Sequence, residues 1–174
     1  MAIGSTREWI ERLENSGELL RISETLSTEL EITEIADRQM KSPGGGKALL
    51  IERPQNANGP ADFPLLINAF GSDRRMAMAL GVGSIEEIAG QLGGLMKAKP
   101  PQSFGEAIRL LGQALDLRHA RPQNVSSGPC QEGVWRQDDP RHKGRGLSRL
   151  PVLKCWPEDG GSFITLPIVV TRDP

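Results

Sequence analysis

Four stretches of the chain place apolar residues three and four positions apart and begin with a capping-box pair, in which Ser or Thr is followed three residues later by Glu. The hydroxyl and the carboxylate of such a pair satisfy free N–H groups in the first turn of a helix. We therefore predict helices that begin at Ser5, Thr28, Ser84 and Ser103, and a further helix from Asp73 to Leu80. The apolar positions expected to face the core are Trp9, Ile10 and Leu13, then Ile32, Ile35, Ala36 and Met40, then Met76, Ala77 and Leu80, then Ile108, Leu111 and Leu115.

Three short apolar runs in the first half of the chain are typical of strands. They cover residues 19–23, 48–51 and 65–69. We expect Arg53 and Pro54 to close the second run and residues 55–60 to form a loop. Because strand and helix patterns alternate here, the sequence predicts an α/β layer.

The last part of the chain predicts two more strands, at residues 150–156 and 163–170, which flank a turn-forming stretch at residues 157–162. In the second run, apolar positions alternate with a period of two. Pro167 has no N–H, so this strand should lie at a sheet edge or contain a bulge. No partner strand follows it, so we expect the opening of a sheet whose completion lies elsewhere.

The same part of the chain resembles the UbiD family of prenylated-flavin-dependent decarboxylases. Residues 151–159 read P-V-L-K-C-W-P-E-D, and residues 164–174 read I-T-L-P-I-V-V-T-R-D-P. The resemblance continues, in collinear order over nearly the whole chain, at residues 30–38, 48–52, 68–72 and 128–131.

Members of that family have an N-terminal α/β domain, a central split β-barrel like that of flavin reductases, and a C-terminal α/β domain. The resemblance implies that residues 1–121 form the N-terminal α/β domain. Residues 122–174 would then be the first strands of the split β-barrel, which is incomplete here. We place the boundary near Arg121 and Pro122, where the composition becomes polar and irregular.

The resemblance implies an enzyme that removes CO2 from an aromatic or α,β-unsaturated carboxylic acid, as in ubiquinone biosynthesis. Its cofactors would be prenylated FMN, Mn²⁺ and K⁺. The family's catalytic and metal-binding residues have no matching position before Pro174, so we expect no catalytic or metal residue here and a chain that alone is inactive and binds no cofactor. Thr171 and Arg172, at a strand end, are the candidate cofactor contacts.

The implied partners are the remaining barrel and the C-terminal domain, on the same chain or a separate one, in a homo-oligomeric enzyme. The specific acid is not readable from the sequence. An alternative is a non-catalytic subunit or interaction module that is derived from the UbiD family and pairs its free sheet edge with a partner.

Two other groups of residues have the composition of a site. Residues 44–47, Gly-Gly-Gly-Lys, could cradle a phosphate, but they lack the P-loop spacing, which favours a loop that ends a helix. Cys130, Cys155, His119 and His142 lack zinc-finger spacing, and a cysteine–histidine pair stays possible only on paper. The sequence favours Cys155 as a small buried residue.

Two charged pairs complete the candidates. Glu158 and Asp159 could share a proton or bind a cation, but adjacent carboxylates in a Gly-rich turn favour solvation. Arg74 and Arg75 could bind an anion at a helix start, and a solvated basic pair is the favoured interpretation.

The composition narrows the function classes. The 174-residue chain has a formal net charge of −1, 4% aromatic residues and no Tyr, which argues against a nucleic-acid partner. No apolar run approaches the roughly 20 residues of a membrane-spanning helix, and the first residues lack a signal-peptide pattern. We expect a cytoplasmic protein.

Overall fold

The structure, a computed structural model, describes residues 3–96, 125–128, 140 and 146–164. The predicted helix at Ser103, the polar stretch around residues 130–137 and most of the 138–146 loop lie outside these residues.

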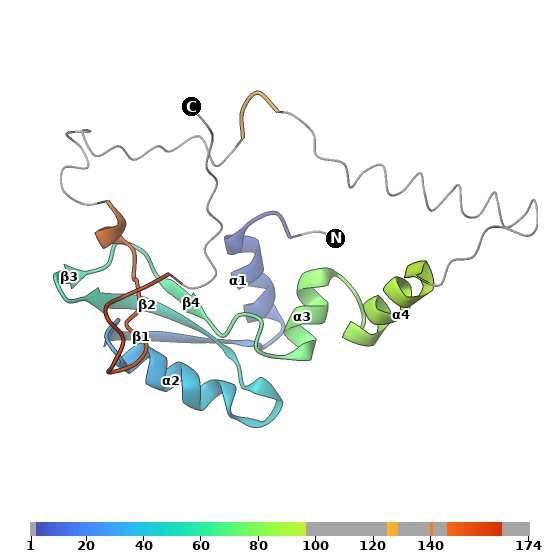
Figure 1. The fold of residues 1–174 in the computed structure, drawn as a ribbon, viewed down its shortest axis with the longest axis horizontal. Helices are drawn as coiled ribbons and strands as arrows, with labels where there is room; N and C mark the ends of the chain where they lie inside the picture. Colours follow the sequence, from blue (N-terminus) through green and yellow to red (C-terminus); the bar gives the residue numbers. More distant parts are fainter. Residues whose placement is uncertain (1–2, 97–124, 129–139, 141–145, 165–174) are drawn as a thin grey trace, which may run out of the picture.

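A four-stranded mixed sheet that is not closed forms the centre of the described part (Figure 1). Its strands are β1 (Leu19–Ser27), β2 (Ala48–Asn56), β3 (Gly59–Pro60) and β4 (Leu65–Ile67). β1 runs parallel to β2, whereas β3 and β4 both pair antiparallel with the other side of β2. Strand β2 is therefore the only one of the four with partners on both sides.

Four α-helices accompany the sheet in the described residues: α1 (Thr6–Asn15), α2 (Glu31–Met40), α3 (Asp73–Leu80) and α4 (Ile85–Met96). In Figure 1, α1 lies above the sheet and α2 below it. Two apolar clusters follow from this arrangement, because successive residues of a strand point to opposite faces. Leu49 and Ile51 pack with Ile32 on the α2 side, and Ala48 packs with Trp9 and Leu13 on the α1 side.

The helix predictions at Ser5, Asp73 and Ser84 are confirmed. Ser5 caps α1 by accepting the N–H of Glu8 at 3.2 Å. Helix α3 has the predicted bounds, and α4 is described from Ile85 to Met96. The predicted apolar stripe of α3 is only partly right, since Ala77 is buried whereas Met76 and Leu80 are exposed.

The prediction that Thr28 caps the second helix is wrong. Thr28 is buried, and its hydroxyl donates to the side-chain oxygen of Asn56 at 3.2 Å. Helix α2 instead follows Leu30, which turns the chain with a φ of 67° and makes no side-chain cap. Met40, predicted to face the core, is exposed.

The second strand is longer than predicted. Strand β2 continues through Pro54 to Asn56, and the expected loop at residues 55–60 is a hairpin with β3. Pro54 does not end the strand because the sheet pairs here through carbonyl groups and needs no N–H from the proline. Its carbonyl accepts the N–H of Ala61 at 2.9 Å, and the carbonyl of Gln55 accepts the N–H of Thr28 at 2.9 Å.

The end bounds of the other strands also differ from the sequence predictions. β1 extends to Ser27, past an irregularity between Ile22 and Thr25. β4 ends at Ile67 because Asn68 adopts a φ of 57°.

The strand predicted at residues 150–156 is reduced to two isolated bridges, at Leu153 and Lys154. A short 3-10 turn, Leu147–Arg149, precedes it. The antiparallel bridge joins Leu153 to Phe163 across the predicted turn.

Candidate functional site

The first polar centre of the molecule is Arg75, whose side chain is fully buried. Nη1 donates to Glu18 Oε2 at 3.0 Å and to the carbonyl of Gly46 at 2.6 Å, and Nη2 donates to the carbonyl of Gly45 at 3.1 Å. The interpretation of Arg74 and Arg75 as a solvated pair is therefore wrong for Arg75. It holds better for Arg74, which is largely exposed while pairing with Glu18 Oε1 at 2.9 Å.

Two loops meet at this centre, residues 43–47 and residues 68–72. Asn68 joins them, since Nδ2 donates to the carbonyls of Gly45 and Lys47, both at 2.9 Å. The contact is so close that a Cβ on Gly45 would lie 1.8 Å from the carbonyl oxygen of Gly71. Gly45 is therefore required by the packing of the two loops.

A hollow of about 800 Å³ opens between these two loops. Its charged side chains have both signs, with Lys47 and Arg74 against Glu18 and Asp73. The carbonyls of residues 45–47 are engaged by Arg75 and Asn68. These contacts support the interpretation of residues 44–47 as a loop that ends a helix.

The pair Glu158 and Asp159 stabilises a turn. Asp159 Oδ2 accepts the N–H groups of Cys155 at 3.1 Å and Trp156 at 2.8 Å, while Glu158 is exposed. The carboxylate of Asp159 closes the turn by accepting the N–H groups three and four residues before it. Cys155 is a free thiol of intermediate exposure, so the expectation that it is buried is wrong.

No group of three or more His, Cys, Asp and Glu side chains that could hold a metal is found within residues 3–96 and the later described segments. The candidate cofactor contacts Thr171 and Arg172 lie outside the described residues, as do His119, His142 and Cys130. None of the described helices has both the length and the apolar composition needed to cross a bilayer.

Among the residues that the structure describes, two surface carboxyls have shifted pKa values, and neither lines the hollow. The hydrogen bond from Arg21 lowers the pKa of Glu14, and its Nε–Oε1 distance is 2.6 Å. The backbone N–H of Glu86 and the hydroxyl of Ser84 lower the pKa of Glu86. These shifts follow from charge-assisted hydrogen bonds at exposed positions, which makes them structural features.

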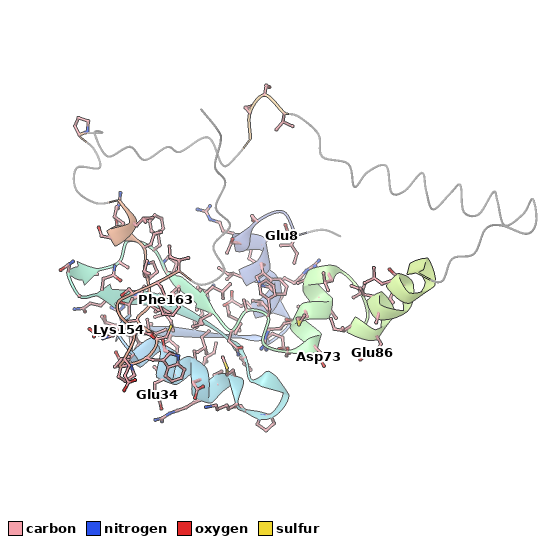
Figure 2. All side chains as sticks on the ribbon, viewed as in Figure 1. Glu8, Glu34, Asp73, Glu86, Lys154 and Phe163 are labelled. Atoms are coloured by element: carbon pink, nitrogen blue, oxygen red, sulfur yellow. The ribbon has the colours of Figure 1, made fainter. Side chains whose placement is uncertain are left out.

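The second polar centre joins the residues that follow β1 to a segment more than a hundred residues later in the chain. We call residues 147–154 the strap. Lys154 N–H donates to the carbonyl of Thr28 at 3.1 Å, and Leu30 N–H donates to the carbonyl of Lys154 at 3.0 Å. The N–H of Phe163 donates to the carbonyl of Leu153 at 3.0 Å, and Figure 2 shows Lys154 and Phe163 close together beside the sheet. No sequence signal predicted these pairs. Thr28 and Lys154, for example, are more than a hundred positions apart in the sequence.

Two family descriptions match the chain in order. "3-octaprenyl-4-hydroxybenzoate carboxy-lyase N-terminal domain" matches residues 10–92. "3-octaprenyl-4-hydroxybenzoate carboxy-lyase Rift-related domain" matches residues 123–174. The strap lies within the second matched part, and its hydrogen bonds to Thr28 and Leu30 hold it against the first.

Curated relatives match over the same range. An uncharacterized protein of Archaeoglobus fulgidus is 42% identical over 174 residues, which are 100% of this chain and 33% of that protein. An uncharacterized protein of Aquifex aeolicus is 44% identical over 167 residues, which are 96% of this chain and 32% of that protein. The chain spans about a third of the length of these relatives.

Solved structures show the same fold. The vanillic acid decarboxylase of Sedimentibacter hydroxybenzoicus, in open form with a truncated ShVdcD, matches with a TM-score of 0.63 and 21% identity over 93% of this chain and 30% of that chain. A second open-form structure of the same decarboxylase, ShVdcCD, matches with a TM-score of 0.57 and 20% identity, again over 93% of this chain and 30% of that chain. At this identity the likeness shows a shared fold.

Proposed function

Because the chain belongs to the UbiD family, we propose that it is the N-terminal part of a decarboxylase that removes CO2 from an aromatic or α,β-unsaturated carboxylic acid. The observation that carries this proposal is the ordered match of both family parts, at residues 10–92 and 123–174. The fold likeness to a vanillic acid decarboxylase supports it.

The cofactor proposal rests on the family. The electron sink that decarboxylation needs is supplied there by prenylated FMN, with Mn²⁺ and K⁺. The described residues do not fit such a group, because they hold no metal-binding cluster and the hollow beside α3 has charges of both signs. We therefore assign no catalytic step to the described residues and keep Thr171 and Arg172 as the proposed cofactor contacts.

The domain proposal places an α/β domain at residues 1–121 and the beginning of a split β-barrel at residues 122–174. The isolated antiparallel bridge between Leu153 and Phe163 is compatible with a barrel that begins in this part of the chain. The remaining barrel and the C-terminal domain are the proposed partners, in the same chain or a second one. The presence of ShVdcD in the similar structure favours testing both arrangements.

The experiment that tests this function measures CO2 release from aromatic and cinnamate-like acids by a polypeptide of the relatives' full length that begins with this sequence. It would be supplied with prenylated FMN, Mn²⁺ and K⁺. We expect release that falls at least about tenfold in Arg172→Ala, since a charge-assisted ligand contact is worth about 1.5–3 kcal/mol. The matched control is Arg7→Ala, on the exposed side of α1, which should keep full activity.

Release that is equal in both variants would remove Arg172 from the site. No release from any acid with the cofactors bound would contradict the decarboxylase proposal.

A further inference from the structure

The strap is joined to the sheet by the side chain of Asn56, the last residue of β2. Nδ2 donates to the carbonyls of Ser148 and Leu150, each at 3.1 Å. Oδ1 lies within hydrogen-bond distance of the Thr28 hydroxyl, 3.2 Å, and the carbonyl of Gln55 is a second acceptor for that hydroxyl at the same distance. All polar atoms of this amide are therefore engaged, and they connect three segments: the end of β2, the residue after β1, and the strap.

A primary amide suits this position because it has two donor hydrogens on one nitrogen and a separate acceptor oxygen. The two carbonyls it binds are two residues apart, one within the 3-10 turn Leu147–Arg149 and one just after it. The amide thus determines where the turn ends and the extended part of the strap begins. Aspartate has the same shape but no donor, so it would leave both carbonyls without this partner.

The position of the strap determines where the later residues of the chain lie. Once Ser148 and Leu150 are held, Lys154 lies in register with Glu29, and Leu153 packs against the apolar cluster of α2. Leu153 in turn accepts the N–H of Phe163. Asn56 is therefore linked, through the backbone of the strap, to the start of the segment that continues toward residue 174.

The ionic contacts beside the amide differ in exposure. Lys154 Nζ lies 3.5 Å from Glu29 Oε1, and the Glu29 side chain is more than half exposed, so this pair contributes little to stability and is screened by salt. Arg149 pairs with Asp62, both side chains are mostly buried, and the N–H of Asp62 donates to the carbonyl of Arg149 at 3.1 Å. That contact holds Arg149 alone, whereas the amide of Asn56 holds the carbonyls of the residues on both sides of it.

We propose that Asn56 is a positioning residue that sets the register of the strap, and with it the start of the barrel segment at Phe163, on the N-terminal α/β layer. Thr28 supports it by orienting the amide. The consequence for catalysis rests on the proposed function, because the segment after Phe163 leads toward Thr171 and Arg172. The register itself requires neither flavin nor metal.

The test is amide hydrogen exchange on the 174-residue chain, read residue by residue by NMR. In Asn56→Asp we expect exchange at Leu30, Lys154 and Phe163 to rise up to about tenfold, as for the loss of one to two hydrogen bonds. Exchange at Leu50, in the middle of β2, should stay within about twofold and shows that the sheet is folded. Thr28→Val should act in the same direction with a smaller effect.

The matched control is Asn58→Asp, which makes the same chemical change at an exposed position of the same hairpin. It should leave all four amides unchanged. Unchanged exchange at Lys154 and Phe163 in Asn56→Asp would overturn the proposal, and so would an equal rise at Leu50, which would make Asn56 a residue of general stability. Because the exchange pattern is independent of cofactor and substrate, its failure and a failure of CO2 release are separate outcomes.

Discussion

The layer formed by β1, β2 and α2 differs in kind from the two loops that meet at Arg75. In the layer, Ile32, Leu49 and Ile51 are fully buried, and apolar contact with neighbours holds them. At the loops, a buried guanidinium, an asparagine and closely packed glycines hold the backbone through its carbonyls. The first region tolerates repacking, whereas the second depends on individual polar partners.

The largest expected effect comes from removing the charge at the loops. Arg75→Met would leave the carbonyl of Gly46 without its partner. Glu18 would keep only the exposed Arg74, and the carbonyl of Gly45 would keep only Asn68. We expect a loss of about 3–5 kcal/mol in the free energy of unfolding, as when one member of a buried pair is removed. The measurement is urea unfolding followed by circular dichroism.

The matched control is Arg74→Met, because Arg74 pairs with the same carboxylate while its side chain is 66% exposed. It should cost less than about 1 kcal/mol. Equal losses in the two variants would show that burial does not distinguish these arginines and would break the comparison between the two regions.

A smaller effect is expected from a methyl group in the glycine run. Gly45→Ala combines a φ of 80° with a Cβ 1.8 Å from the carbonyl of Gly71, so the loops would have to separate. Gly44→Ala has nearly the same φ, 71°, but open space around its Cβ. We expect about 1–2 kcal/mol for Gly44→Ala from the left-handed conformation alone and a clearly larger loss for Gly45→Ala, both measured by urea unfolding.

Similar losses for the two alanine variants would mean that backbone conformation, and not the close approach of the loops, explains the glycines. That result would leave Arg75 and Asn68 as the main contacts between the loops.

The sequence predicted the apolar layer better than the polar contacts, and the reason is distance along the chain. The bounds of α3 and the buried run at 48–51 follow from local periodicity, which neighbours a few positions apart determine. The prediction for Arg75 was wrong because its partner Glu18 is 57 positions away. The prediction for Thr28 was wrong because a local capping pattern competed with a distant amide, Asn56.

The candidate site was predicted less well still. The glycine run fits either a phosphate site or a packed loop, and the pair Glu158 and Asp159 fits either a cation site or a turn. Only the hydrogen bonds in the structure distinguish these alternatives. Thr171 and Arg172 stay predictions that come from a family motif. No periodicity or charge pattern identifies them, because a ligand contact leaves no repeating signal in a single sequence.

The smallest expected effect is a pH dependence at the exposed ion pair between Glu14 of α1 and Arg21 of β1. The pKa of Glu14 is lowered in the folded state by hydrogen bonds from Arg21. A lowered folded pKa contributes stability above the unfolded pKa of about 4.5, and this contribution is lost as the pH falls through the folded value. Glu14→Gln should therefore be slightly less stable than the parent chain at pH 7 and indistinguishable from it in strong acid.

Unfolding of both proteins from pH 7 down to pH 2 would check this, with Glu11→Gln on the same helix as the control. A difference that grows toward low pH would have the wrong sign for the Arg21 contact.

The most direct test of the central claim is a titration with prenylated FMN and Mn²⁺, read by absorbance together with native mass. It would be made on the 174-residue chain alone and on its mixture with a polypeptide that supplies the rest of the barrel and the C-terminal domain. We predict binding in the mixture, with a stable complex, and none by the chain alone. Tight binding by the chain alone would contradict the claim that the cofactor site needs the rest of the barrel. No binding and no complex in either sample would contradict the decarboxylase proposal and favour a non-catalytic module.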